Sequence, residues 1–186
     1  MSTICVVKKD GYVAIAADSR GKSGELETRD TYIANHEKIF QIGNNFIAIC
    51  GHAALNLALQ DYFHSLKIEP SFQNVSTIFR FWVELQCHLN EKYNMAEDEN
   101  DILIANPYGI FGITDNYSVH EYNRFHSFGS GDHFALGAMY VAYQYPARTA
   151  EDVARIGVES GCEFATVSGP PIYSYSIKLL APDTNT

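Results

Sequence analysis

An aspartate–glycine pair near the start of the chain constrains the fold more than any other feature of the sequence. Two runs rich in β-branched and small apolar residues, 3–7 and 12–17, flank the turn Lys9-Asp10-Gly11. Asp-Gly between two such runs is a strong signal for a β-hairpin. Chain ends usually fray unless a sheet or a docked helix holds them. We therefore expect the first residues of this chain to lie in a strand, inside a sheet.

The rest of the chain predicts a layered α+β domain. Strands are expected at 38–42, 46–50, 102–105, 110–114, 118–122, 124–128 and 173–180. Apolar periodicity indicates helices at 55–66, 75–89, 132–145 and 149–164. Residues 18–35 have the composition of a polar loop, and 102–128 that of a second run of hairpins. This segregated order favours two antiparallel sheets stacked face to face with helices outside, an αββα sandwich.

Length and charge narrow the classes of function. The 186 residues, 46% of them apolar, fit a single domain over 1–186. A net charge of −9 without any Lys/Arg cluster argues against nucleic acid or an anionic membrane as a partner. No apolar run approaches the about 20 residues of a membrane span, and the first residues lack the plan of a signal peptide. We expect a cytoplasmic protein.

Metal and cofactor chemistry has little support in the sequence. The four cysteines lie far apart in apolar segments and are predicted to be buried, reduced thiols: Cys5, Cys50, Cys87 and Cys162. Neither these cysteines nor the seven histidines show the spacing of a metal site. No Gly-rich phosphate loop is present either. We expect no metal and no cofactor.

Ser2 is the first candidate for chemistry. Removal of Met1, which a small second residue permits, would leave Ser2 with both a hydroxyl and a free α-amine. Such an amine has a pKa of about 7.7–8.0, so it can act as the base that a serine nucleophile needs. Asp18 closes the second strand near the chain start, and Lys38 begins a later strand. A lysine beside the nucleophile would lower its pKa, and an aspartate would compensate the lysine; both residues also fit a surface ion pair.

Four short stretches stand out in the chain: Ala16-Ala17-Asp18, Lys38-Ile39-Phe40-Gln41-Ile42, Cys50-Gly51 and Gly129-Ser130-Gly131. In their order and spacing they resemble a proteasome β-type subunit, most closely the bacterial members such as the HslV peptidase and the bacterial proteasome homologues. The resemblance covers nearly the whole chain. It implies the N-terminal nucleophile hydrolase fold, which is an αββα sandwich.

The resemblance also implies roles for individual residues. Ser2 is similar to the family's threonine nucleophile, and the other catalytic positions are Asp18, Lys38, Ser130 and Gly51, whose N–H is the oxyanion donor. Substrate-binding positions are Arg20 and Ile49; supporting positions are Gly129, Gly131, Glu163 and Thr166. An apolar Ile49 at the base of the specificity pocket would favour cleavage after hydrophobic residues.

The chain departs from the family pattern at three points. Serine replaces the usual threonine, Glu163 stands where proteasomes have aspartate, and the stretch between Arg20 and Lys38 is longer than in proteasomes. Thr3 could serve as the nucleophile if two leading residues were cleaved, but the spacing to Asp18 aligns without a gap only from Ser2.

The implied function is a self-compartmentalised peptidase that cleaves unfolded proteins or peptides. Its subunits would form stacked homo-oligomeric rings, twelve or fourteen subunits in all, with an ATPase unfoldase as a candidate partner. Two other classes fit the same residues. One is a ring-forming pseudoenzyme or scaffold, which retention of Met1 would favour. The other is an N-terminal nucleophile amidase that acts on a small molecule.

Overall fold

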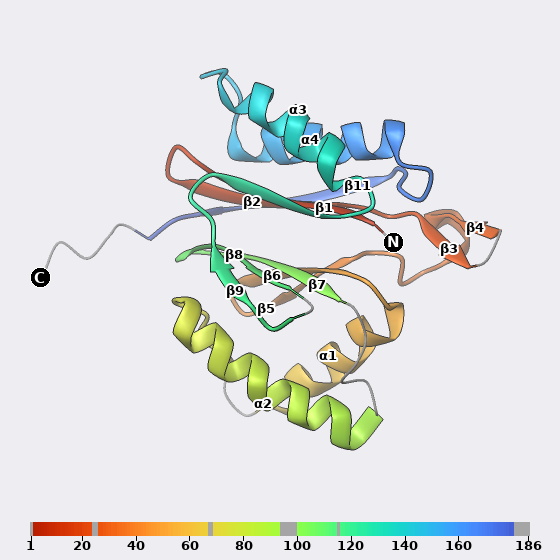
Figure 1. Cartoon of the computed structure of the whole chain (residues 1–186), viewed down its shortest axis with the longest axis vertical. Coiled ribbons are helices and arrows are strands. Elements are labelled where there is room, and N and C mark those ends of the chain that lie inside the picture. The colour runs from red at the N-terminus through yellow and green to blue at the C-terminus, as the bar shows by residue number, and fades with distance from the viewer. Residues whose placement is uncertain (1, 24–25, 67–68, 94–99, 115, 181–186) are drawn as a thin grey trace, which may run out of the picture.

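The computed structural model describes residues 2–23, 26–66, 69–93, 100–114 and 116–180, which form four layers (Figure 1). Helices α3 (Asp132–Tyr143) and α4 (Ala150–Phe164) cover one sheet. Helices α1 (Ala53–Ser65) and α2 (Val75–Tyr93) cover the other. The αββα sandwich expected from the sequence is confirmed.

The first sheet contains the start of the chain as an inner strand. Its order is β10-β1-β2-β11, formed by β10 (Phe125–Gly129), β1 (Thr3–Lys9), β2 (Tyr12–Asp18) and β11 (Ile172–Lys178), all antiparallel. The β1–β2 turn has φ of 50° at Asp10 and 79° at Gly11. Positive φ at both central residues is the geometry that an Asp-Gly hairpin turn adopts. The predicted hairpin is therefore present, and β1 is held on both edges.

The second sheet has the order β5-β6-β7-β8-β9. Its strands are β5 (Ile39–Ile42), β6 (Asn45–Cys50), β7 (Asp101–Asn106), β8 (Gly109–Ile113) and β9 (Val119–Glu121). The expected second run of hairpins ends at β9, because β10 crosses to the first sheet and pairs with β1. The prediction of a plain loop over 18–35 is also wrong. That stretch holds the hairpin β3 (Gly21–Ser23) and β4 (Leu26–Thr28) and the 3-10 turn η1 (Asp30–Tyr32).

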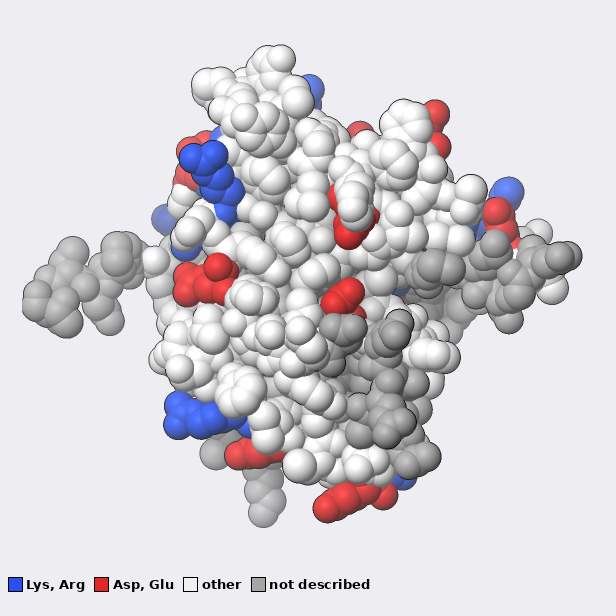
Figure 2. All heavy atoms as spheres, in the orientation of Figure 1, with Lys and Arg blue, Asp and Glu red and all other residues white. Residues whose placement is uncertain are grey.

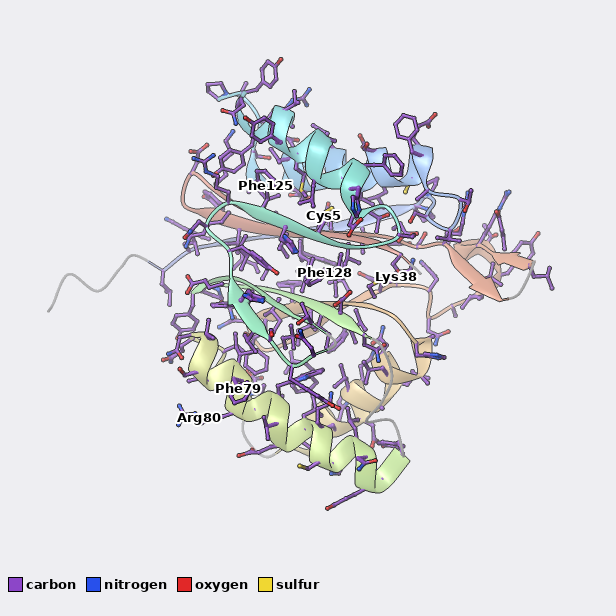
Figure 3. All side chains as sticks on the ribbon, in the orientation of Figure 1. Cys5, Lys38, Phe79, Arg80, Phe125 and Phe128 are labelled. Atoms are coloured by element: carbon purple, nitrogen blue, oxygen red, sulfur yellow. The ribbon has the colours of Figure 1, made fainter. Side chains whose placement is uncertain are left out.

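Strand β1 is buried on both faces because it lies between a helical layer and the second sheet. Ile4 and Val6 pack between the two sheets. Cys5 and Val7 point to the other side and pack under α3 and α4. Figure 3 labels Cys5 on this helical side. Successive side chains of a strand point to opposite faces, and both faces of β1 are covered. Residues 4 to 7 are therefore all apolar.

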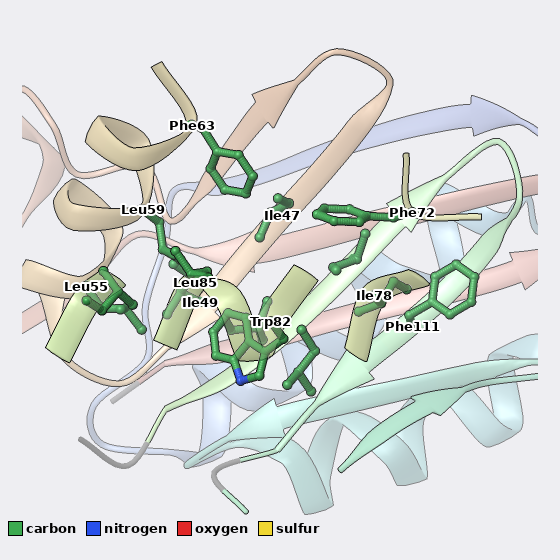
Figure 4. Close-up of a cluster of buried hydrophobic side chains, with 14 of the residues drawn as sticks. Ile47, Ile49, Leu55, Leu59, Phe63, Phe72, Ile78, Trp82, Leu85 and Phe111 are labelled. Carbon is green, nitrogen blue, oxygen red and sulfur yellow. The ribbon is translucent and has the colours of Figure 1, made fainter. Parts of the chain in front are cut away.

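A third cluster fills the space between the second sheet and helices α1 and α2 (Figure 4). Leu59 of α1 and Trp82 and Leu85 of α2 pack there on Ile47 of β6. The spacing of these residues on α2 is that of one helix face turned to a sheet. The helices predicted from this periodicity are confirmed.

The surface agrees with part of the sequence-based expectations. On the face seen in Figure 2, Lys and Arg side chains are scattered and do not gather into a patch. None of the helices in the described part of the chain is long and apolar enough to cross a membrane.

All four cysteines are free. Cys5 and Cys50 are buried, but Cys87 is exposed and Cys162 is half-buried, so the prediction that every thiol is buried is wrong at these last two residues.

Candidate active site

The site lies at the end of the sandwich where the chain begins. Strand β1 starts at Thr3, which pairs with Gly129 of β10 on one side. Ile4 pairs with Ala17 of β2 on the other side. Ser2, immediately before the strand, is only 4% exposed. The residue expected to carry the nucleophile is therefore fixed by the sheet, and Met1 lies outside the described residues.

Asp18 is the centre of the hydrogen-bond network at this end. Its side chain is fully buried. Oδ1 accepts from the Thr3 amide at 2.9 Å and from Lys38 Nζ at 2.7 Å. Oδ2 accepts from the amides of Arg20 at 3.2 Å and Gly169 at 3.0 Å. Four donors satisfy the carboxylate, which stabilises its charge away from water.

Lys38 precedes β5 and reaches across from the second sheet to the first. Besides Asp18, its ammonium donates to the Arg20 carbonyl at 2.8 Å. Its side chain is 15% exposed. Figure 3 shows Lys38 at the end of the sandwich where β1 begins. The 2.7 Å contact confirms the prediction that the side chains of Asp18 and Lys38 lie together; it does not test their roles in catalysis.

Gly129 and Ser130 contact the backbone of Ser2 from the other side. Ser130 Oγ donates to the Ser2 carbonyl at 3.4 Å. Gly129 has φ of +105°, and a Cβ there would lie 2.0 Å from the same carbonyl oxygen. Gly131 has a similar reason to be glycine, because its Cβ would lie 2.2 Å from Thr3 Oγ1. The three-residue turn thus permits a close approach that side chains would block.

Gly51 follows β6 directly and is exposed, with φ of +149°. Its neighbour Cys50 lies close to the turn that contacts Ser2, because a Cβ built on Gly129 would lie 3.0 Å from Cys50 Sγ. Burial raises the pKa of the Cys50 thiol, while the Lys38 charge and a hydrogen bond from the Ser2 backbone lower it. The thiol is therefore protonated at neutral pH, and the β6 end that carries Gly51 lies beside Ser2.

Ser168 and Gly169, which follow α4, also belong to this site. Ser168 Oγ and Thr3 Oγ1 are hydrogen-bonded at 2.7 Å, and both residues are fully buried. Gly169 supplies one of the amides that bind Asp18, and its carbonyl accepts from Ser19 at 3.2 Å. These contacts fix the segment after α4 against the first strand. No local signal could have found them, since Ser168 is 165 residues from Thr3.

Glu163 and Thr166, predicted as supporting residues, lie at the surface. Neither side chain makes a hydrogen bond to β1 among the described residues. Ser168, two residues after Thr166, instead makes a buried hydrogen bond to Thr3 of β1. The structure therefore brings the α4–β11 segment to the site through Ser168 and Gly169.

Arg20 and Ile49, predicted to bind substrate, have different surroundings. The Arg20 side chain lies over Gly169, where a Cβ would meet Nε at 2.3 Å, and forms an ion pair with Glu27 at 3.8 Å. Ile49 is 6% exposed and belongs to the cluster between the second sheet and α1 and α2, where Figure 4 labels it. Arg20 thus lies within the site, whereas the Ile49 side chain lies in the core between β6 and helices α1 and α2.

The chemistry of these groups suits acyl transfer. The buried Asp18 holds the Lys38 ammonium beside the first residues of β1, and a positive charge at this place can favour a serine hydroxyl as a nucleophile. The described residues contain no group of three or more His, Cys, Asp or Glu side chains that could hold a metal ion.

Solved structures include relatives of this chain. Two structures of Thiobacillus denitrificans BPH, a bacterial proteasome homologue, have 43% and 45% sequence identity and a TM-score of 0.93. They cover 96% and 97% of this chain and 100% of their own, and the first is a complex with epoxomicin. Eukaryotic HslV from Trypanosoma brucei shares the fold, with 17% identity, a TM-score of 0.73 and coverage of 95% and 99%. No protein-family model and no curated protein matches the sequence.

Proposed function

Because the chain belongs to the family of bacterial proteasome homologues, we propose that it is a peptidase subunit whose nucleophile is Ser2, freed by removal of Met1. The observation that carries the proposal is the contact of Lys38 and of the Thr3 amide with one oxygen of the buried Asp18. This contact brings a positive charge to the first residues of β1, where the nucleophile would be.

The proposed reaction begins with attack of Ser2 Oγ on the substrate carbonyl carbon, while the Ser2 α-amine takes the hydroxyl proton. The positive charge of Lys38 lowers the pKa values of both groups, which favours the neutral amine and a developing alkoxide. The Gly51 N–H donates to the oxyanion; one such donor contributes about 3–4 kcal/mol in comparable enzymes. The C–N bond then breaks, and the protonated α-amine gives its proton to the leaving amine.

An ester between Ser2 Oγ and the acyl part of the substrate remains. Water attacks this ester with the α-amine again as the base, so that the acid is released and the hydroxyl is restored. Ser130 would hold the Ser2 carbonyl during both steps, and Gly129 would keep the space that this requires. The proposed substrates are unfolded proteins or peptides.

We propose a double ring of this subunit in the cytoplasm, where enclosure would keep folded proteins away from Ser2. An ATPase unfoldase remains a proposed partner. Cleavage after hydrophobic residues, which the resemblance implied from an apolar residue at position 49, stays a prediction that profiling with a peptide library tests. A preference for acidic or basic residues would contradict it.

Hydrolysis of a fluorogenic peptide by the untagged protein tests the proposal. Ser2→Ala should abolish hydrolysis, because the nucleophile is lost while Met1 removal is still permitted. Ser2→Thr should retain it. Ser176→Ala, an exposed change on β11, is the control and should behave as wild type. Hydrolysis that survives in Ser2→Ala would contradict the proposal.

Sedimentation of the same samples separates the other two candidates. An inert protein that retains Met1 and sediments as a ring would be a scaffold. A monomer or dimer that cleaves small amides and leaves peptides intact would be an amidase. The proposal requires both a ring and peptide hydrolysis.

A further inference from the structure

The segment just before β5 is tied to the edge strand β11 by a histidine–tyrosine pair. His36 Nδ1 lies 2.7 Å from the Ile33 carbonyl, and His36 Nε2 lies 2.7 Å from the Tyr173 hydroxyl. A carbonyl can only accept, so Nδ1 carries the hydrogen. In the neutral ring Nε2 then accepts, and the Tyr173 hydroxyl donates. This pair therefore has a defined donor and acceptor.

A second pair follows at the next residue. The Tyr175 hydroxyl donates to Glu37 Oε1. The Tyr175 ring also stacks on Phe46 of β6, with 4.8 Å between the ring centroids. The hydrogen bond to Glu37 and burial raise the pKa of Tyr175 to about 12. The hydroxyl thus remains a donor at neutral pH, and the ring bridges the two sheets.

Both tyrosines lie on the strand beside the one that carries Asp18. In the register of β11 and β2, Tyr173 lies opposite Ala17 and Ile172 opposite Asp18. On the other side of the ion pair, His36 and Glu37 directly precede Lys38 in the chain. The two pairs consequently connect the backbone before the lysine to the same part of the sheet that holds the aspartate.

Lys38 needs such a connection because it precedes β5 of the second sheet, whereas Asp18 ends β2 of the first sheet. Its four-carbon stem is flexible, so its ammonium position depends on where the backbone is held. It must reach Asp18 Oδ1 at 2.7 Å and the Arg20 carbonyl at 2.8 Å at once. The segment from 29 to 37 contains no strand that could fix it through a sheet.

We propose that the His36–Tyr173 and Glu37–Tyr175 pairs, the β11 clamp, position Lys38 for its role in catalysis. The inference rests on the proposed function, in which the Lys38 charge lowers the pKa values of Ser2. The four clamp residues are positioning residues, because they act through Lys38. Loss of one hydroxyl should increase the fraction of molecules in which Lys38 leaves Asp18, and these molecules would be inactive.

Tyr173→Phe, Tyr175→Phe and the double variant test the clamp in the untagged, assembled protein. Each change removes one hydroxyl and retains the ring. Tyr140→Phe, at a residue of α3 that is 62% exposed, is the matched control. Each single variant should lower kcat about fivefold with KM unchanged, as expected for one hydrogen bond. The control should match wild type.

Labelling of lysines by reductive methylation with peptide mapping provides a readout that needs no activity. Lys38 should react about fivefold faster in each single variant, because its protected state becomes less populated. Lys9, whose ammonium is held by the Tyr145 and Arg148 carbonyls, should react as in wild type.

Unchanged Lys38 labelling in the double variant would overturn the clamp. Equal acceleration at Lys9 would overturn it as well, since it would indicate general loosening. A rise in KM alone would also contradict a positioning role. An inert wild type would refute the proposed function, while selective exposure of Lys38 would still support the clamp geometry.

Discussion

The amide of Thr3 donates a 2.9 Å hydrogen bond to Oδ1 of Asp18, an oxygen that no solvent reaches. Lys38 binds the same oxygen at 2.7 Å. A buried carboxylate needs hydrogen-bond donors around it, and the first amide of β1 is one of the donors that Asp18 has. Structure and proposed chemistry therefore depend on the same contact.

Replacement of Lys38 by methionine should both inactivate and destabilise the protein. The variant keeps an unbranched side chain one atom shorter and leaves the Asp18 side chain with three backbone donors only. We expect a loss of about 2–3 kcal/mol, since removal of one partner from a buried pair costs about 3–5 kcal/mol without such donors.

The double variant Asp18→Asn, Lys38→Met should be more stable than Lys38→Met alone, because it removes the unpaired charge. Thermal unfolding of the three proteins measures this order. A double variant that melts below Lys38→Met would contradict the account.

Gly129→Ala should displace the start of β1. Its φ of +105° disfavours any side chain, and the new Cβ would lie 2.0 Å from the Ser2 carbonyl oxygen. We expect loss of peptide hydrolysis and a lower melting temperature. Gly137→Ala is the control, because a Cβ there meets nothing within 4 Å in the middle of α3. It should stabilise the protein by about 0.5–1 kcal/mol.

Ser168→Ala should cost more than an ordinary surface substitution. It leaves the buried Thr3 Oγ1 without its 2.7 Å partner, which costs about 1–3 kcal/mol. Thr3→Val combined with Ser168→Ala removes both polar groups and should recover part of that loss. Denaturant unfolding compares Ser168→Ala, Thr3→Val and the double variant. If the double variant shows the sum of two single losses, the hydroxyl pair is not coupled.

Stability should fall as the pH decreases below about 6.5, in part through His126. Its ring stacks on Tyr122 at 4.1 Å and meets Phe128 edge-on at 4.8 Å. Burial lowers the pKa of His126; Asp132 opposes this shift and His120 adds to it. The unfolded chain then binds more protons between the two pKa values, so stability rises with pH across that window. His126→Gln should show a shallower dependence of melting temperature on pH; an unchanged slope would contradict this.

Much of the fold could be predicted because local signals agree with it. The Asp10-Gly11 turn, the alternation along β1 and the helical period of α2 each act over a few residues. The partner of β10 could not be predicted in this way. A short strand after β9 fits a hairpin equally well, and only packing between the sheets decides that it joins β1.

The candidate site was predictable where its residues lie at strand ends. Asp18 and Lys38 each occupy such a position, and the resemblance placed them together. Ser168 and Gly169 were missed because their contacts span the whole chain and follow from where α4 ends. The β11 clamp was missed for the same reason, since Tyr173 and Tyr175 read only as strand residues.

The most direct test of the central claim is the intact mass of the untagged protein before and after incubation with epoxomicin, the compound in one BPH structure. The account predicts a chain that lacks Met1 and gains one epoxomicin, which peptide mapping assigns to Ser2. A stable adduct of this kind would use both the hydroxyl and the α-amine. A chain that retains Met1 and gains no mass would contradict the claim that Ser2 is an N-terminal nucleophile.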